Sequence, residues 1–205
     1  MKKIVKDALI LTAITLISGC LLGLVYEITK NPIAKAQYNA QQKAYQAVFE
    51  EAESFEDYEG FEEAEAAEVV AGSGYTENTI NGVVEAKDAS GNTLGYVISL
   101  TSHAGYGGDI TFSVGITKAG VVNGYSITSI GETAGLGMKA KEEKFSSQFR
   151  EKNADSLEVV KGTAANENQI EAISGATITS KAMTNGVNAA LAYFRAISEG
   201  GGANE

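Results

Sequence analysis

The stretch Asp109-Ile110-Thr111-Phe112-Ser113-Val114-Gly115-Ile116-Thr117 alternates large apolar residues with small or polar ones. Successive side chains of a β-strand point to opposite faces, so Ile110, Phe112, Val114 and Ile116 would share one face. The alternation therefore predicts a strand over 109–117 whose apolar side packs on a core.

Segments on both sides of this strand carry similar signals. β-like runs occupy 69–71, 80–86, 93–101 and 121–130, with turns at 90–92 and 118–120. Strands joined in succession by short turns pair antiparallel. Apolar residues at helical spacing predict helices over 139–150 and 180–197. We therefore expect an α+β fold in which helices flank a largely antiparallel sheet.

A membrane span precedes this domain. Residues 8–26 contain no charged side chain, and a helix of that length spans about 28 Å, close to the thickness of a bilayer. Lys2, Lys3 and Lys6 come just before the span. The positive-inside rule then predicts a cytoplasmic N-terminus and a main domain on the extracytoplasmic side.

Two alternatives to an uncleaved anchor exist for this segment. A cleaved signal peptide has a short apolar core and a small-residue cleavage site, whereas this run continues without a polar break. The run Ile17-Ser18-Gly19-Cys20 also resembles a bacterial lipobox, which would lipidate Cys20. Because apolar residues follow Cys20 where a lipoprotein has a polar linker, we favour the anchor.

Composition limits the possible functions. The formal net charge is −10, which argues against nucleic-acid binding. Ten acidic residues and no Lys or Arg lie between Glu50 and Glu68, as expected for a solvated, mobile segment or for a docking face toward a basic partner. The single cysteine excludes structural disulfides, and the sequence has no Cys/His cluster for zinc or iron–sulfur, so we expect no metal site. Electrons passing through this chain would need an organic cofactor.

The run Ser174-Gly175-Ala176-Thr177-Ile178-Thr179-Ser180 opens onto the last predicted helix. A helix start near Thr179 or Ser180 presents unpaired N–H groups and the positive end of the helix dipole, which together favour an anion such as phosphate. The simpler interpretation is that one of these two hydroxyls is an N-cap. The residues by themselves leave both interpretations open.

The same run resembles the flavinylation motif of the covalent-FMN-binding family, which includes the G subunit of Rnf-type ion-translocating complexes and the C subunit of sodium-pumping NADH:quinone oxidoreductases. In that family a flavin transferase joins the FMN phosphate to a threonine as a phosphodiester. The resemblance implies that Thr177 is the acceptor and that Ser174, Gly175, Ala176 and Thr179 surround it.

Two glycine-rich loops strengthen the resemblance. Taken alone, Gly105-Tyr106-Gly107-Gly108-Asp109-Ile110 and Gly131-Glu132-Thr133-Ala134-Gly135-Leu136-Gly137 are typical of turns. Both resemble family patterns, in the family's order, with Ala134 where some members have proline. The resemblance implies FMN contacts from the following residues: Tyr106, Gly107, Glu132, Thr133, Gly135, Leu136 and Gly137.

The resemblance also implies individual roles. Leu136 would lie against the isoalloxazine ring, and Glu132 and Thr133 would position the ribityl chain. Lys139 would face the phosphate, or it is an ordinary surface lysine. His103, the single histidine, is interpreted as a strand-end residue, since a proton relay needs partners that the sequence does not show.

The predicted organisation has four parts. Residues 1–30 form the cytoplasmic N-terminus and anchor, and 31–68 form a stalk helix over 33–53 followed by the acidic segment. An FMN-binding domain occupies 69–198, and 199–205 form a disordered tail. We expect this stalk to continue the membrane span into the aqueous side, with Pro32 either near a new helix start or kinking a single long helix.

The resemblance implies an electron-relay component of a translocase, with no complete active site and no catalytic residue on this chain. Its partners would be membrane lipid, other integral membrane and cytoplasmic subunits of an Rnf-type ferredoxin:NAD⁺ oxidoreductase, and a flavin transferase for maturation. Three alternatives remain: the C subunit of a sodium-pumping NADH:quinone oxidoreductase, a free-standing tethered flavoprotein, and a non-redox anchored binding module.

Overall fold

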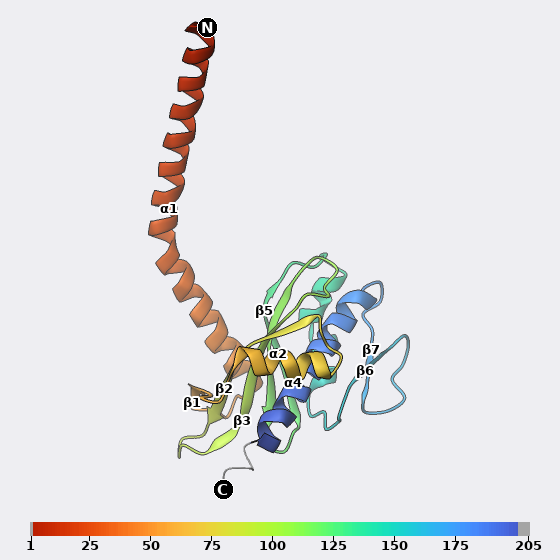
Figure 1. Cartoon of the computed structure of the whole chain (residues 1–205). Coiled ribbons are helices and arrows are strands. Elements are labelled where there is room, and N and C mark those ends of the chain that lie inside the picture. The colour runs from red at the N-terminus through yellow and green to blue at the C-terminus, as the bar shows by residue number, and fades with distance from the viewer. Residues whose placement is uncertain (1, 201–205) are drawn as a thin grey trace. The chain divides into compact units, whose positions relative to one another are not determined.

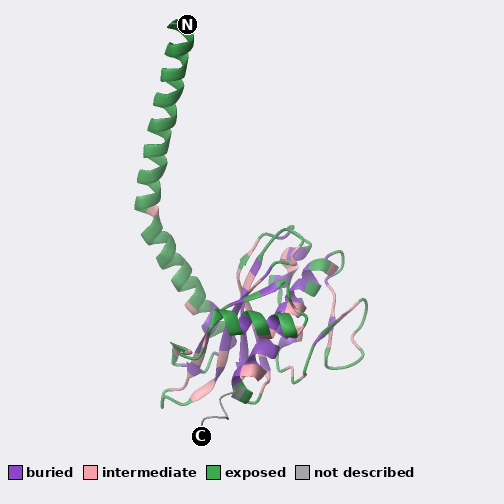
Figure 2. Ribbon diagram, viewed as in Figure 1, coloured by how far each residue is buried: buried purple, intermediate pink, exposed green. Residues whose placement is uncertain are grey.

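A single helix makes up the first of two units in this protein. The computed structural model describes residues 2–200, which divide after Gln42 (Figure 1). Helix α1 (Lys2–Val48) runs through the first unit, where nearly every residue is exposed (Figure 2). It is long and apolar enough to cross a membrane. The Thr12 hydroxyl donates to Ala8 O (2.9 Å) and that of Thr15 to Leu11 O (3.1 Å), so these polar groups are paired within the helix.

Pro32 lies inside α1, so the helix predicted over 33–53 continues the apolar span as one long helix and does not start anew at Pro32. A proline removes one backbone donor, but long helical segments on both sides retain their own hydrogen bonds and continue across it. The helix ends at Val48, earlier than expected. There Asn123 Nδ2 donates to the Val48 carbonyl (3.1 Å), one of the carbonyls that a helix end leaves unpaired.

The second unit contains the predicted antiparallel sheet. Its five strands lie in the order β1 (Ser54–Asp57), β2 (Asn78–Lys87), β3 (Thr93–Ser102), β4 (Ile110–Thr117) and β5 (Val122–Ile130). Every neighbouring pair is antiparallel, which confirms the prediction from short turns. Strand β4 places Val114 opposite Ile98 on one side and Tyr125 on the other.

The main core lies on one face of this sheet. Helices α4 (Thr177–Gly200) and α2 (Glu63–Gly72) cover that face (Figure 1). The four alternating residues of β4 are all 0% exposed and belong to this core. A smaller cluster on the opposite face joins Tyr45, Val48 and Phe49 to strand residues Val84 and Val97. Both faces of the sheet are therefore buried in part, as the purple strands in Figure 2 show.

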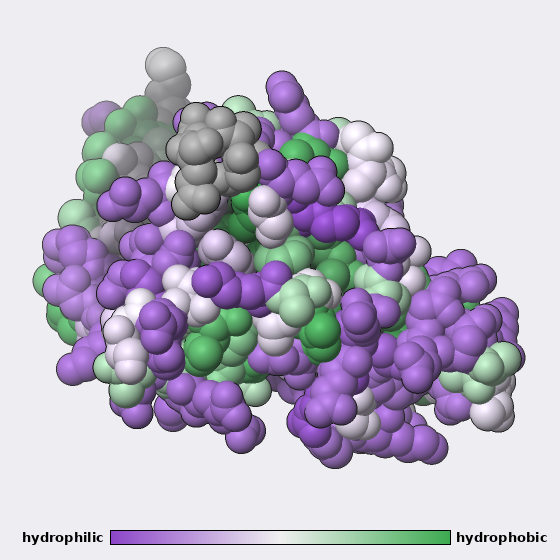
Figure 3. Space-filling model, turned by 90° about the horizontal axis from the view of Figure 1, so that it is seen from below, coloured by the Kyte–Doolittle hydropathy of each residue, from purple (hydrophilic) through white to green (hydrophobic). Residues whose placement is uncertain are grey.

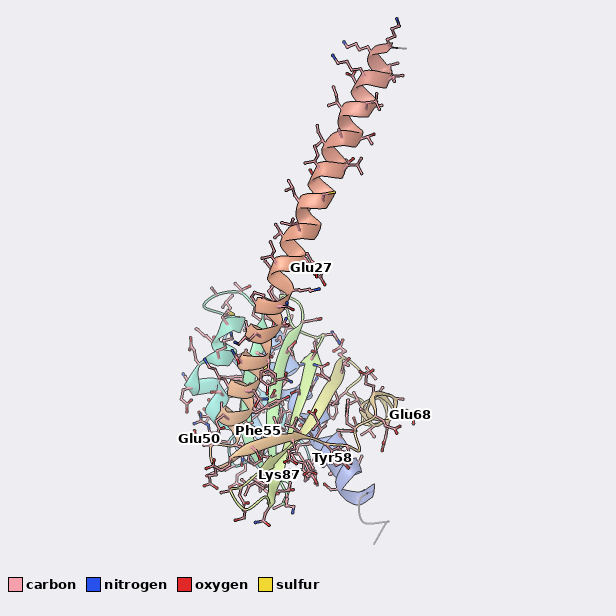
Figure 4. All side chains as sticks on the ribbon, turned by 90° about the vertical axis from the view of Figure 1, so that its left-hand side faces the viewer. Glu27, Glu50, Phe55, Tyr58, Glu68 and Lys87 are labelled. Atoms are coloured by element: carbon pink, nitrogen blue, oxygen red, sulfur yellow. The ribbon has the colours of Figure 1, made fainter. Side chains whose placement is uncertain are left out.

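The acidic segment is more ordered than its composition suggested. It contributes strand β1 and the first turns of α2, whereas we expected a mobile segment followed by a β-like run at 69–71. Alanine and glutamate favour helix, and Ala66 and Val70, one turn apart, bury the same side of α2. Phe55 of β1 packs on the smaller cluster, and Glu68 lies on α2 (Figure 4).

Three further differences concern shorter elements. The helix predicted over 139–150 is divided into η1 (Gly137–Lys141), α3 (Glu143–Ser146) and η2 (Ser147–Phe149). A parallel pair, β6 (Glu158–Val160) and β7 (Gln169–Glu171), was not predicted. Helix α4 reaches Gly200, and the rest of the predicted tail, 201–205, lies outside the described residues.

The compact second unit begins at Lys43 and includes β1 and α2. The predicted domain boundary at residue 69 lies inside α2 and leaves β1 outside the predicted domain. The face of the molecule shown in Figure 3 is mostly hydrophilic with scattered apolar areas, as expected for a water-exposed body.

Candidate functional site

Three segments that are far apart in sequence meet around one cavity of about 550 Å³. They are the loop between β3 and β4, the loop after β5, and the start of α4. The cavity is lined by Tyr106, Glu132, Thr133, Leu136, Gly137, Gly175, Ala176, Thr177, Ile178 and Thr179. Nine of these ten residues belong to the set that the sequence predicted as a site.

The loop after β5 forms the first wall, and a buried carboxylate joins it to the loop between β3 and β4. Glu132 is only 7% exposed, and its Oε1 accepts a hydrogen bond from Tyr106 N (2.7 Å). The two loops also touch through their backbones, because a Cβ on Gly107 would lie 2.4 Å from Gly131 O. The predicted glycine at 107 therefore supports the cavity by allowing this approach and does not line it.

The segment after the first wall is anchored to the core. Tyr125 of β5 donates its hydroxyl to Ala140 O in η1 (2.6 Å). Burial raises the pKa of Tyr125 above its ordinary value, which keeps the phenol protonated and able to donate. This hydrogen bond fixes the position of η1, and Gly137 at the beginning of η1 lines the cavity.

The start of α4 forms the second wall. The helix begins at Thr177, and Gly175 two residues earlier has φ +78°, a left-handed conformation that favours glycine. The predicted start near Thr179 or Ser180 was therefore too late, and neither hydroxyl is the N-cap. In an α-helix the first N–H groups have no intrahelical acceptor, so those of Thr177 and Ile178 are free of helical partners at the cavity.

The two walls meet in close contact at Gly137. A Cβ built there would lie 2.5 Å from Glu132 Oε2, 2.7 Å from Thr179 Oγ1 and 2.8 Å from Glu132 Cβ. Thr179 itself is almost fully buried. Glycine at 137 therefore lets the carboxylate of one wall lie beside the hydroxyl of the other.

We predict that Gly137→Ala forces the walls apart and destabilises the domain by about 1–3 kcal/mol, the usual cost of overpacking. Denaturant unfolding measures the change in free energy. The matched control is Gly131→Ala in the same loop, where the added Cβ would make only an ordinary contact of 3.5 Å with Gly107 O. Equal stability of the two variants would show that the contact at Gly137 is not needed.

The mouth of the cavity is apolar. Tyr106, Leu136 and Ile178 are 71%, 42% and 53% exposed, an unusual position for large apolar side chains. Sequence reasoning did not select Ile178, although it lies inside the quoted motif between two selected threonines. Apolar surface around a few hydroxyl and N–H groups is typical of sites for small organic ligands.

Besides Gly107, three predicted residues lie outside this cavity. Lys139 and Ser174 line a neighbouring cavity of about 220 Å³ together with Lys144, Glu142 and Phe145. Gly135 is exposed in the first wall with φ +76°. No lysine or arginine is among the described residues that line the main cavity, so an anion there would depend on backbone N–H groups.

His103 follows β3 directly and has partners that the sequence did not reveal. Its Nδ1 lies 2.9 Å from Asp109 Oδ1, and its Nε2 lies 3.1 Å from Thr79 Oγ1. The contact between His103 and Asp109 links the two ends of the loop that carries Tyr106. His103 itself does not line the cavity. Among residues 2–200, no group of three or more His, Cys, Asp or Glu side chains is placed to hold a metal ion.

Comparison with known proteins gives two family matches. Residues 105–192 match the FMN-binding domain, and residues 1–48 match the RnfG N-terminal region. The first match covers all three segments that line the cavity, and the second coincides with α1.

Individual relatives match over most of the chain. The G subunit of the proton-translocating ferredoxin:NAD(+) oxidoreductase complex of Clostridium ljungdahlii is 36% identical, over 88% of this chain and 86% of the relative. The G subunit of the Na(+)-translocating ferredoxin:NAD(+) oxidoreductase complex of Acetobacterium woodii is 33% identical, over 97% and 95%. The crystal structure of Shewanella oneidensis NqrC is 19% identical with a TM-score of 0.48, over 58% of this chain and 59% of that one.

Proposed function

Because this chain belongs to the RnfG family, the G subunits of ion-translocating ferredoxin:NAD⁺ oxidoreductase complexes, we propose that it relays electrons in such a complex through FMN attached to Thr177. The observation that carries the proposal is the cavity itself. It brings the hydroxyl-bearing start of α4 together with the two glycine-rich loops.

The residues present fit FMN in both its polar and its apolar parts. The phosphate would lie at Thr177, beside the unpaired N–H groups of the first turn of α4 and on the favourable end of the helix dipole. The isoalloxazine ring would lie against Leu136, Ile178 and Tyr106, whose exposed apolar surface it would cover. When bound, FMN supplies the capacity to accept and release electrons.

Attachment would use the Thr177 hydroxyl as a nucleophile toward phosphorus. The transfer forms one Oγ–P bond, breaks the bond between phosphorus and the leaving group of the flavin donor, and releases the hydroxyl proton. A flavin transferase would catalyse it, because the described residues that line the cavity include no lysine, arginine or histidine that could activate the phosphate. A covalent tether would prevent loss of the cofactor.

Helix α1 would anchor the domain in the membrane, with the N-terminus in the cytoplasm and the FMN on the other side. No carboxylate occurs in residues 8–26, so this helix offers no side chain for ion passage. Ion translocation would therefore take place in other subunits. This chain would pass electrons between cofactors of its integral membrane neighbours, while ferredoxin and NAD⁺ would bind cytoplasmic subunits.

Mass spectrometry of the purified chain tests the proposal. We expect the proteolytic peptide that contains Thr177 to carry one FMN less one water, and the denatured protein to show flavin fluorescence on a gel. Copurification with integral membrane subunits would distinguish a member of a complex from a free-standing flavoprotein. An unmodified Thr177 peptide from colourless native protein would contradict covalent attachment and favour an anchored binding module.

A further inference from the structure

One buried hydroxyl forms hydrogen bonds with the turn that precedes the second wall of the cavity. Ser180 is 0% exposed. Its Oγ accepts a hydrogen bond from Ile173 N (2.9 Å) and donates one to Ala176 O (2.9 Å). These two partners lie at opposite ends of the turn 173–176, so a single side chain closes the turn from both sides.

Backbone hydrogen bonds complete the same network. Ala176 N donates to Ile173 O (2.9 Å) across the turn, and Ser180 N donates to Ala176 O (3.0 Å) to begin the helix. Thr177 comes directly after Ala176, so the direction of its Cα–Cβ bond depends on how firmly the turn is held. Ser174 and Gly175, in the middle of the turn, are exposed.

We propose that Ser180 is a positioning residue that orients the Thr177 tether, and with it the attached flavin, without taking part in the attachment. The inference rests on the proposed function, because it concerns FMN bound to Thr177. Full burial separates the Ser180 hydroxyl from any flavin donor or transferase at the surface. Its effect on the cofactor must therefore pass through the turn and the first turn of α4.

Removing the hydroxyl has a defined local consequence. Ile173 N would lose its acceptor while remaining in a residue that is only 7% exposed, and a buried donor without a partner is unfavourable. The turn and the first turn of α4 would then loosen together. Because Gly175, Thr177 and Thr179 form the second wall, the wall would lose its fixed position opposite the loop 132–137.

The same helix supplies a matched control. Thr184, one turn after Ser180, is also buried, but its Oγ1 has no hydrogen-bond partner among the described residues. Thr184→Val removes a buried hydroxyl from α4 and leaves the turn untouched. Ser180→Ala removes the hydroxyl that closes the turn. Ser180→Cys keeps a side chain of similar size with a weak donor. If Ser180→Ala does not fold, this variant tests whether the Ser180 hydroxyl orients the tether.

The experiment measures flavin order in the full chain, purified in detergent after expression with its flavin transferase. Time-resolved fluorescence anisotropy reports nanosecond motion of the flavin. Only molecules that carry flavin emit, so incomplete attachment does not alter the reading. We expect Ser180→Ala and Ser180→Cys to increase the amplitude of the nanosecond motion and to lose most of the visible circular dichroism of the flavin, while Thr184→Val matches the unaltered protein.

Two results would overturn the inference. One is flavin motion and dichroism unchanged in a folded Ser180 variant. The other is a folded Ser180 variant that carries no covalent flavin, which would give Ser180 a part in attachment. Absence of covalent flavin from the unaltered protein is a different result, because it contradicts the proposed function itself.

Discussion

Thr177→Val is expected to abolish covalent flavin in this protein, because the proposed acceptor oxygen is removed. Valine has nearly the shape of threonine but no oxygen, so no Oγ–P bond can form. Thr177 is half-buried at the cavity, so the fold should change little, by about 0.5 kcal/mol or less. We expect complete loss of flavin fluorescence from the denatured gel band, while far-ultraviolet circular dichroism shows that the domain remains folded.

The matched control for this prediction is Thr177→Ser, which keeps a hydroxyl at the same position and should retain covalent flavin. Flavin absorbance that survives in native Thr177→Val but disappears on denaturation would show that the cavity also binds FMN without the tether. A denatured Thr177→Val band that still fluoresces would place the attachment on another residue, and the assignment of Thr177 would be wrong.

The second large effect concerns membrane orientation. Replacing Cys20, the single cysteine, by serine gives a background free of thiols. In that background we expect Lys161→Cys, on an exposed loop after β6, to react with a membrane-impermeant maleimide in intact cells. Lys3→Cys, before the apolar span, should react only after the membrane is opened. The contrast is all-or-none because the bilayer excludes the charged reagent.

The two cysteine variants serve as controls for each other, since both side chains that they replace are exposed. Labelling of Lys3→Cys but not Lys161→Cys in intact cells would reverse the topology. Labelling of both in cells with intact membranes, together with release of the protein into the soluble fraction, would show that α1 does not span the membrane.

Local patterns predicted the sheet well because the burial of a strand is encoded in its own alternation. The four apolar residues of β4 share the core face, and strands β2 to β5 lie close to their predicted bounds. The same reasoning failed for 69–71, where two adjacent valines resemble a strand. Their alanine- and glutamate-rich surroundings favour helix, and packing of Ala66 and Val70 on the core decided the outcome.

The residues that line the cavity were largely predictable from the sequence, but their arrangement was not. The motif and the two glycine-rich loops identified most residues that line the cavity. Lys139 and Ser174 line a neighbouring cavity because η1 and α3 pack against the segment after β7. No local sequence pattern encodes this packing. The partners of His103 likewise come from β2 and from the residue just before β4.

The amino-acid sequence by itself determined the helix that is long and apolar enough to cross a membrane, the strand pattern and the hydroxyl-bearing run before the last helix, because each depends on neighbouring residues alone. Only the tertiary structure decided that Glu132 lies beside Thr179 and that Ser180 closes the turn before Thr177. The first contact joins segments more than forty residues apart, and the second depends on where α4 begins. Such contacts form when the core packs, since the burial that holds them in place is shared by the whole domain.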